Sequence, residues 1–314
     1  MSIQRRRFLI DTDTASDDAV ALVMALRDPG VEVLAITVVA GNVPLDQAVQ
    51  NALYTVELVG ADVPVYAGCA APLLQPLHTA QIVHGQDGMG DIGLPVHGRT
   101  PAPGHAVDVL AELIEAHEPG ELTLVTLGPL TNIAILLTRH PEYATRLREI
   151  VVMGGTGDGM GNITAAAEFN IWVDPEAAAV VYGAGARLVQ VGWDISRKYA
   201  VFDAAQAAEL RAVGRLGAFA VDIQAVLTAF TETGTRLAGF DLPDPIAMGV
   251  ALDPSIATEM PYVNVVVEAR GEFTRGATIV VHTGYTGRPA NTHVVLAASR
   301  ERFVTLLKER LRED

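Results

Sequence analysis

Phe8-Leu9-Ile10-Asp11-Thr12-Asp13-Thr14-Ala15-Ser16-Asp17-Asp18 is the stretch that decides how this chain folds. Its apolar start predicts a buried strand, and its end predicts the first turn of a helix. Asp11 and Asp13 are two residues apart, so their side chains lie on one face at the end of that strand. Asp17 and Asp18 fall at the helix start, where the helix dipole favours anions. We therefore expect four carboxylates to converge at the ligand edge of an open α/β sheet.

Four like charges at this spacing repel one another unless a cation or shared protons relieve them. Ser16 is a typical helix N-cap, and acids in the following turn are ordinary capping residues. That interpretation explains Asp17 or Asp18, but it does not explain Asp11 and Asp13 as well. Hard carboxylate oxygens in this number favour calcium or magnesium over zinc. The cluster therefore predicts a metal or polyol site.

The composition limits the classes of partner. The chain has 314 residues, half of them hydrophobic, and a formal net charge of −15. That charge disfavours a nucleic-acid backbone or an anionic membrane surface, and it favours a neutral or cationic small molecule. Cys69 is the only cysteine, which excludes a disulfide scaffold. No apolar stretch is as long as a membrane span or a signal-peptide core, so we expect a cytoplasmic protein.

Apolar runs alternate with helical patterns along most of the chain. The β-branched run Val31–Val39 is typical of a strand buried on both faces. Repeated alternation of this kind predicts an α/β fold, with a mostly parallel, doubly wound sheet flanked by helices in a single domain over residues 1–314. The other expected strands are Phe8–Ile10, Val63–Tyr66, Leu122–Leu127, Ile150–Met153 and Leu188–Val191, and the expected helices are Ala19–Leu26, Leu45–Val59, Val107–Ala116, Leu130–Thr138 and Pro175–Tyr182.

The C-terminal third departs from this alternation. Residues from about 204 to 233 predict alanine-rich helix, and Ser299–Arg312 predicts a charged amphipathic helix that closes the chain. Between them, strand patterns with Gly-rich turns predict a C-terminal β extension, with a hairpin added to the sheet. These strands are Pro261–Glu268, Ala277–His282 and His293–Ala297.

Polar side chains suited to a sugar follow several of the expected strands. Asn42 follows the second strand, Asn162, Glu168 and Asn170 follow Ile150–Met153, and Asp244 begins a later helix. Amides and carboxylates suit neighbouring hydroxyls, because each hydroxyl both donates and accepts a hydrogen bond. Taken singly, each asparagine is more typical of a turn or a cap. Together at one edge of one sheet, these residues favour a polyol site.

The segment from Asp11 to Leu22 resembles the N-terminal signature of the inosine-uridine type nucleoside hydrolases. This signature and Glu168-Phe169-Asn170 are specific, whereas the Gly-Pro-Leu-Thr-Asn turn is weaker alone. The resemblance covers roughly residues 8 to 250 and implies the nucleoside hydrolase fold. Further matches, in the order of the family, are Val39–Asn42, His84–Gly88, Gly128–Asn132, Met153–Gly155, Ala167–Ile171 and Asp174–Ala178.

The resemblance implies a calcium-dependent enzyme of nucleoside salvage that hydrolyses the N-glycosidic bond of ribonucleosides to free base and ribose. Ca²⁺ would be bound by Asp13, Asp18, the backbone carbonyl of Leu127 and Asp244. Asp13 would also be the catalytic base that activates a calcium-bound water, and the sugar would pass through an oxocarbenium-like transition state. Direct attack by water would invert the configuration at the anomeric carbon.

The resemblance also implies how the ribose is held. Asp11 would orient the other carboxylates without touching the substrate. A homodimer or homotetramer is implied as well, and nothing in this chain selects one. The substrate-binding residues would be Asp17 and Asn170 at the ribose diol with Asn42 nearby, Asn162 and Glu168 at the 5′-hydroxyl, and Met153 beneath the ring.

One position departs from the family pattern. In the family a histidine precedes the last metal-binding aspartate and helps to protonate the leaving base, whereas this chain has Pro243 there. His84 matches a family position near the base, and a surface-loop histidine is the equally weighted alternative. Phe230 and Arg236 are weaker candidates for the base pocket, and Phe230 is more typical of a core residue. The leaving-group acid is therefore unassigned, and the sequence does not decide between purine and pyrimidine bases.

Three other functions are left open by the residues alone. Another N-riboside, such as nicotinamide riboside or a modified nucleoside, would use the same ribose site. A non-catalytic calcium-dependent ribose-binding protein is disfavoured, because a binder needs no general base. A phosphohydrolase with an aspartate nucleophile is the weakest alternative, because no phosphate-binding lysine lies among these motifs.

Overall fold

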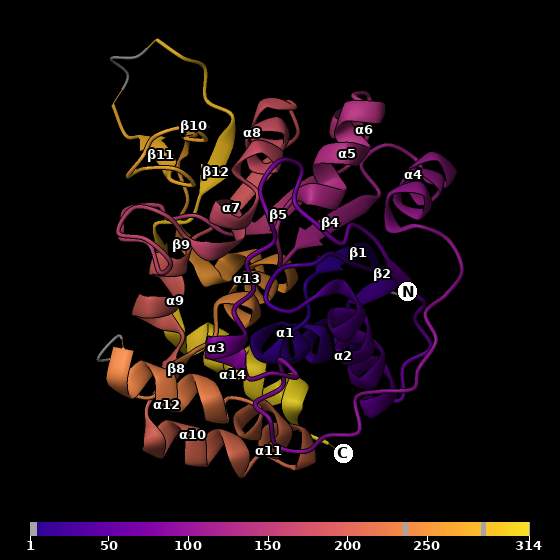
Figure 1. Ribbon diagram of the computed structural model, residues 1–314, viewed down its shortest axis with the longest axis vertical. Coiled ribbons are helices and arrows are strands. Elements are labelled where there is room, and N and C mark those ends of the chain that lie inside the picture. Colours follow the sequence, from indigo (N-terminus) through magenta and orange to yellow (C-terminus); the bar gives the residue numbers. More distant parts are fainter. Residues whose placement is uncertain (1–4, 235–237, 284–286, 314) are drawn as a thin grey trace.

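A large, mostly parallel sheet forms the centre of the molecule, as Figure 1 shows. The computed structural model describes residues 5–234, 238–283 and 287–313. Within them, the main sheet has nine strands in the order β11-β10-β12-β6-β5-β4-β1-β2-β3. The strands from β3 to β12 pair in parallel, and β10 and β11 extend the sheet in antiparallel pairs. Their bounds are β1 Arg6–Thr12, β2 Val31–Val38, β3 Val65–Ala67, β4 Leu122–Thr126, β5 Glu149–Met153, β6 Leu188–Val191, β10 Tyr262–Val267, β11 Thr278–Val281 and β12 Thr292–Val294.

Helices cover both faces of this sheet. Along β1, Phe8 and Ile10 belong to one hydrophobic cluster and Leu9 belongs to the other, as the alternation of side chains along a strand requires. All three side chains are fully buried. The first cluster includes residues of α1 (Ser16–Leu26), α2 (Leu45–Leu58), α11 (Arg215–Asp222), α13 (Pro243–Leu252) and α14 (Arg300–Leu311), and the second includes residues of α4 (Ala106–Ala116), α5 (Thr131–Arg139) and α8 (Pro175–Gly183).

The sheet order places a switch point between β1 and β4. The helix after β1 joins the first cluster, whereas the helix after β4 joins the second, so the two connections leave toward opposite faces. Ligands of open α/β sheets bind beside the carboxyl ends of strands at such a point. Asp13 follows β1 and Leu127 follows β4, so both lie at this edge.

The predicted fold class is confirmed, including the C-terminal β extension. β10 and β11 pair as the expected hairpin, and β10 joins the main sheet through β12. Among the described helices, none is long and apolar enough to cross a membrane.

The expectation of continuous helix over residues 204–233 is wrong. This segment forms three helices, because Gly214 adopts a φ of 152° between the first two and the chain breaks again after Asp222. Four very short strands were not predicted, since two or three residues carry no detectable alternation. These elements are α10 Ala204–Arg211, α11, α12 Ala225–Gly234, β7 Val201–Phe202, β8 Phe240–Asp241, β9 Ala257–Glu259 and β13 Ala297–Ala298.

We predict that Phe303→Ala destabilises the fold by about 3–5 kcal/mol, because it leaves a cavity in the core beneath α14. Phe303 is fully buried, and its ring meets the edge of Phe202 with a centroid distance of 6.4 Å. Urea unfolding measures the change in the free energy of unfolding. Phe273→Ala is the matched control, because Phe273 is 80% exposed. Equal stability of the two variants would contradict this packing.

Candidate active site

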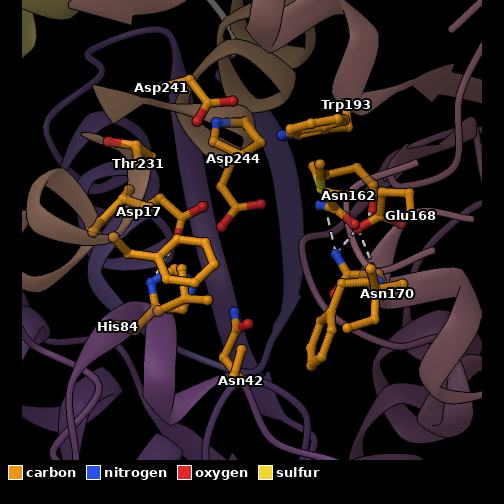
Figure 2. A pocket seen from close by; sticks show the side chains of 18 of the residues that line it. Asp17, Asn42, His84, Asn162, Glu168, Asn170, Trp193, Thr231, Asp241 and Asp244 are labelled. Atoms are coloured by element: carbon orange, nitrogen blue, oxygen red, sulfur yellow. Dashed lines mark hydrogen bonds and ion pairs between the residues drawn. The ribbon is translucent and has the colours of Figure 1, made fainter. Parts of the chain in front are cut away.

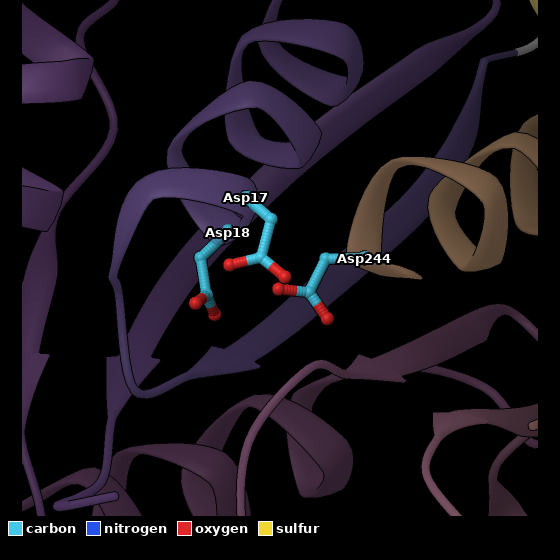
Figure 3. A group of neighbouring side chains, drawn as sticks. All are labelled: Asp17, Asp18 and Asp244. Carbon is cyan, nitrogen blue, oxygen red and sulfur yellow. The ribbon is translucent and has the colours of Figure 1, made fainter. Parts of the chain in front are cut away.

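Three aspartates from two helix starts bring their carboxylates together (Figure 3). Asp17 and Asp18 lie in the first turn of α1, and Asp244 lies in the first turn of α13, which packs against α1. One oxygen from each carboxylate lies within 4.8 Å of the others. All three side chains are buried, so water does not screen their mutual repulsion.

Asp13 lies beside this trio at the end of β1 and is fully buried. Its Oδ2 accepts a hydrogen bond from the backbone N–H of Asn42 at 2.6 Å, whereas Oδ1 has no partner among the described residues. A Cβ atom at Gly41 would lie 2.1 Å from Oδ2, and one at Gly128 would lie 2.7 Å from Oδ1. The two glycines therefore allow the backbone to approach the carboxylate from both sides.

Asp18 is fixed by its own helix start. Its Oδ2 accepts a hydrogen bond from the backbone N–H of Ala15 at 2.9 Å, and its Oδ1 accepts one from the Thr12 hydroxyl at 2.6 Å. Ala15 is the N-cap, so the expectation that Ser16 caps this helix is wrong. Ser16 is the first helical residue, and its hydroxyl instead bonds His84 Nδ1 and Gln224 Oε1, both at 2.9 Å.

Asp11, which was expected to converge with the other carboxylates, instead bonds to residues at the neighbouring strand ends. Its Oδ1 accepts hydrogen bonds from the Thr37 hydroxyl at 2.5 Å and from the Asn132 amide at 2.8 Å. Asn132 also accepts a bond from the backbone N–H of Cys69 and donates one to the Val38 carbonyl. Asp11 thus ties together the ends of neighbouring strands, and its Oδ2 has no partner among the described residues.

Burial and mutual repulsion disfavour the charged forms of these carboxyls. Burial is the larger cause of the raised pKa at Asp13 and Asp244, and charges of the neighbouring aspartates add to it. Burial likewise raises the pKa of Asp17 and Asp18 to about 6 and that of Asp11 to about 7. A cation among the carboxylates would replace these protons as the compensating charge.

The donor set fits a hard divalent cation. Every candidate side-chain ligand is a carboxylate, and oxygen is the preferred donor of calcium and magnesium. Oδ1 of Asp13 and Oδ1 of Asp17 are buried without a hydrogen-bond partner among the described residues. Buried polar atoms are normally paired, so these two oxygens indicate a missing positive partner.

A pocket of about 210 Å³ opens over the cluster. Asp17 and Asp244 line it, whereas Asp11, Asp13 and Asp18 are fully buried behind its wall. Figure 2 shows Asn162, Glu168 and Asn170 on one side, Asn42 at the lower end, and Asp17 and His84 on the opposite side. Of the predicted substrate-binding residues, all seven line this pocket: Asp17, Asn42, His84, Met153, Asn162, Glu168 and Asn170.

Asn170 connects two strand ends. Its side-chain amide donates to the Leu127 carbonyl at 2.7 Å and to the Met153 carbonyl at 3.3 Å. A carbonyl oxygen has two lone pairs, so the Leu127 carbonyl keeps one lone pair for another partner.

Glu168 is the N-cap of the short helix α7 (Phe169–Val173). Its carboxylate accepts hydrogen bonds from the backbone N–H groups of Asn170 and Gly155, both at 2.8 Å. Burial raises the pKa of Glu168 to about 7.

His84 is buried at the end of the short helix α3 (Gln81–His84), so the alternative of a surface-loop histidine is wrong. Its Nδ1 lies 2.9 Å from the Ser16 hydroxyl and 3.7 Å from Asp17 Oδ1. Burial lowers the pKa of His84 to about 4, so its imidazole is neutral near pH 7. A neutral imidazole is a weak acid, and Pro243, which also lines the pocket, has no proton to give.

Several pocket residues were not predicted from the sequence. Asp241 ends β8, and its Oδ2 accepts a hydrogen bond from the Ser196 hydroxyl at 2.8 Å. Trp193 begins α9 (Trp193–Tyr199), and Arg197 lies one turn later. Their signals were positional: Trp193 follows a parallel strand, and Asp241 lies three residues before Asp244. Phe230 also lines the pocket, whereas Arg236 lies outside the described residues.

Comparisons with known proteins identify the family. The family model described as inosine-uridine preferring nucleoside hydrolase matches residues 8–305. The chain belongs to this family.

A pyrimidine-specific ribonucleoside hydrolase, RihA of Salmonella schwarzengrund (strain CVM19633), is 39% identical over 310 residues, which are 97% of each chain. A solved plant nucleoside hydrolase, PpNRh1, superposes with a TM-score of 0.91 at 32% identity and covers 98% of this chain and 99% of its own. A purine-preferring ribonucleoside hydrolase from Gardnerella vaginalis has a TM-score of 0.89 at 31% identity, with 98% of each chain covered. The chain is therefore a nucleoside hydrolase that cleaves the N-glycosidic bond of ribonucleosides.

We predict that the metal-free protein loses stability as the pH rises from about 4.5 to about 7. Folding raises the pKa of Asp11 and Glu168 from their ordinary values of 3.8 and 4.5 to about 7. The stabilisation is therefore fully present below the ordinary pKa values and is lost as the pH rises through the folded ones. His84 acts in the opposite sense between about 4 and its ordinary pKa of 6.5, but it is one group against several buried carboxyls whose pKa is raised to about 6 or 7. Thermal unfolding in chelator measures the effect.

Asp244→Asn is the matched variant for this experiment, because it removes one buried carboxyl and keeps its shape. We expect the melting temperature of this variant to fall less over the same pH interval than that of the wild type. A melting temperature that is constant or rises with pH in the metal-free wild type would contradict the assigned pKa directions.

Proposed function

We propose that the enzyme is calcium-dependent and that Asp13 is the general base of the hydrolysis. The observation that carries this proposal is the convergence of Asp13, Asp17, Asp18 and Asp244, all buried, with unpartnered oxygens on Asp13 and Asp17. Stabilising four carboxylates in one place needs a positive charge of the kind that calcium supplies.

Asp13, Asp18, Asp244 and the Leu127 carbonyl would hold the ion. Asp17 belongs to the close trio with Asp18 and Asp244 and also lines the pocket, which supports a role for it at the ribose hydroxyls beside the ion. When bound, calcium supplies a positive charge that lowers the pKa of water and attracts the ribose hydroxyls. Asp11 would support the site from behind through its bonds to Thr37 and Asn132.

The amide and carboxylate groups of the pocket would hold the ribose. Asp17 and Asn170, with Asn42 beside them, would hydrogen-bond the 2′- and 3′-hydroxyls, and Asn162 and Glu168 would bind the 5′-hydroxyl. Met153 would lie beneath the ring. These contacts fix the anomeric carbon relative to the attacking water, which converts a bimolecular step into an oriented one.

In the chemical step Asp13 would take a proton from the attacking water as its oxygen bonds to the anomeric carbon. Its Oδ1 has no hydrogen-bond partner among the described residues, and its two lone pairs would allow it both to bind the ion and to accept that proton. The glycosidic bond breaks with its electron pair leaving on the base nitrogen, and the sugar becomes oxocarbenium-like. The pocket carboxylates Asp17 and Asp244 would stabilise the positive charge that develops on the sugar.

The identity of the base is a separate question, because the relatives named above include pyrimidine-specific and purine-preferring enzymes. We propose a ribonucleoside as substrate without assigning its base. We also propose a homodimer or homotetramer, which rests on the family resemblance alone.

The test is base release from inosine, adenosine, guanosine, uridine and cytidine, followed by chromatography, with added calcium and with chelator. We expect calcium-dependent release from at least one nucleoside. We expect Asp13→Ala to lower turnover by about a thousandfold or more with the fold intact, because both an ion ligand and the general base are lost.

Asp62→Ala is the matched control, because Asp62 is an exposed aspartate outside the pocket. It should retain wild-type turnover. Release that is equally fast in chelator would disprove the calcium requirement, and wild-type turnover by Asp13→Ala would disprove the role of Asp13. Release from nicotinamide riboside alone would show that the substrate is another N-riboside.

A further inference from the structure

Among the charged side chains that line the pocket, all but one are carboxylates. Four carboxylates line it, from Asp17, Glu168, Asp241 and Asp244. Among the described residues that line the pocket, Arg197 is the only lysine or arginine. Its guanidinium carries a positive charge and five N–H donors. A positive side chain in the pocket of a protein whose net charge is −15 indicates a functional role for that charge.

Arg197 is held by packing rather than by an ion pair. It lies one turn after Trp193 on α9, and its guanidinium carbon is 5.0 Å from the centroid of the Trp193 ring. Among the described residues, the guanidinium makes no hydrogen bond and no ion pair within 4.0 Å. The N–H donors of a half-buried arginine that lines a cavity are thus available to a ligand.

Asp241 is close enough to Arg197 for their charges to interact without forming an ion pair. The charge of Arg197 lowers the pKa of Asp241, against the larger effect of burial, which raises it. The hydroxyl of Ser196, on the same helix as Arg197, donates a hydrogen bond to Asp241 Oδ2 at 2.8 Å. Asp241 is therefore occupied as an acceptor by α9, and the free donors of this cluster belong to Arg197.

The reaction needs a positive group at the leaving base. When the glycosidic bond breaks, its electron pair leaves on the base nitrogen, and this charge must be met by a proton or a cation. His84 is neutral near pH 7, and Pro243 has no proton. Glu168 is engaged by the backbone N–H groups of Gly155 and Asn170 on the side of the pocket that also carries Asn162. None of these groups supplies positive charge.

We propose that Arg197 binds the leaving base and stabilises the negative charge that develops on it. The guanidinium donates hydrogen bonds to ring nitrogen or carbonyl oxygen acceptors of the base, and it gives up no proton. The departing base keeps the electron pair of the broken bond and is then protonated by solvent water. This inference rests on the proposed function, because it assigns a residue to the base end of the same site.

The test compares natural ribonucleosides with p-nitrophenyl β-D-ribofuranoside, whose leaving group is stable as an anion without assistance. Arg197→Met keeps much of the packing on Trp193 and removes the charge. We expect its kcat to fall about a hundredfold on inosine and uridine and less than about threefold on the p-nitrophenyl riboside. Arg197→Lys should recover part of the loss. Arg187→Met is the matched control, because Arg187 is exposed, pairs with Glu149 and lies outside the pocket.

Equal losses on both classes of substrate would overturn the proposal, because a structural or ribose-positioning role does not depend on the leaving group. Unchanged turnover on both would overturn it as well. A defect confined to nucleoside 5′-monophosphates would show that Arg197 binds a phosphate and not a base. If the wild type hydrolyses none of these ribosides, the proposed function fails first, and that result is distinct from a defect limited to the Arg197 variants.

Discussion

The repulsion among buried carboxylates at the carboxyl edge of the sheet is the constraint on which this structure depends. Asp13, Asp17, Asp18 and Asp244 lie where water cannot screen them, and their raised pKa values express the cost of charging them together. A protein keeps such an arrangement only where something compensates it. The same carboxylate oxygens that repel one another can bind one cation together and can accept hydrogen bonds from a sugar.

The fold brings the cluster together through two helix starts and one strand end. Asp13 comes from β1, Asp17 and Asp18 from α1, and Asp244 from α13. Helices α1 and α13 pack against each other within the same hydrophobic cluster, and this packing sets the separation of their first turns. The N-terminal ends of both helices favour negative charge and so offset part of the repulsion. The packing of α1 against α13 thus contributes to the hydrophobic core and also sets the geometry of the site.

The sequence was sufficient to predict the features that depend on residues close together in the chain. The strand, the turn and the helix that carry Asp11 to Asp18 are contiguous, and alternation of apolar runs was enough to give the parallel sheet. The cap was misassigned by one residue, because Ser16 uses its hydroxyl for His84 and Gln224, which are distant in the chain.

Asp241 and Arg197 were missed for a similar reason. Asp241 reaches the pocket through the pairing of two-residue strands β7 and β8, and Arg197 reaches it by stacking on Trp193. The pairing of β7 and β8 leaves no pattern in the sequence, because the tertiary fold alone brings these strands together. Trp193 and Arg197 are one turn apart on α9, but the sequence does not show that this turn lines the pocket.

The most direct test of the central claim is calorimetric titration of calcium into the metal-free protein, with and without ribose present. The account predicts a single calcium site per chain, loss of that site in Asp244→Asn, and binding of ribose only when calcium is present. Absence of calcium binding by the folded wild type, or unchanged binding by Asp244→Asn, would contradict the claim that the buried aspartates form a cation site.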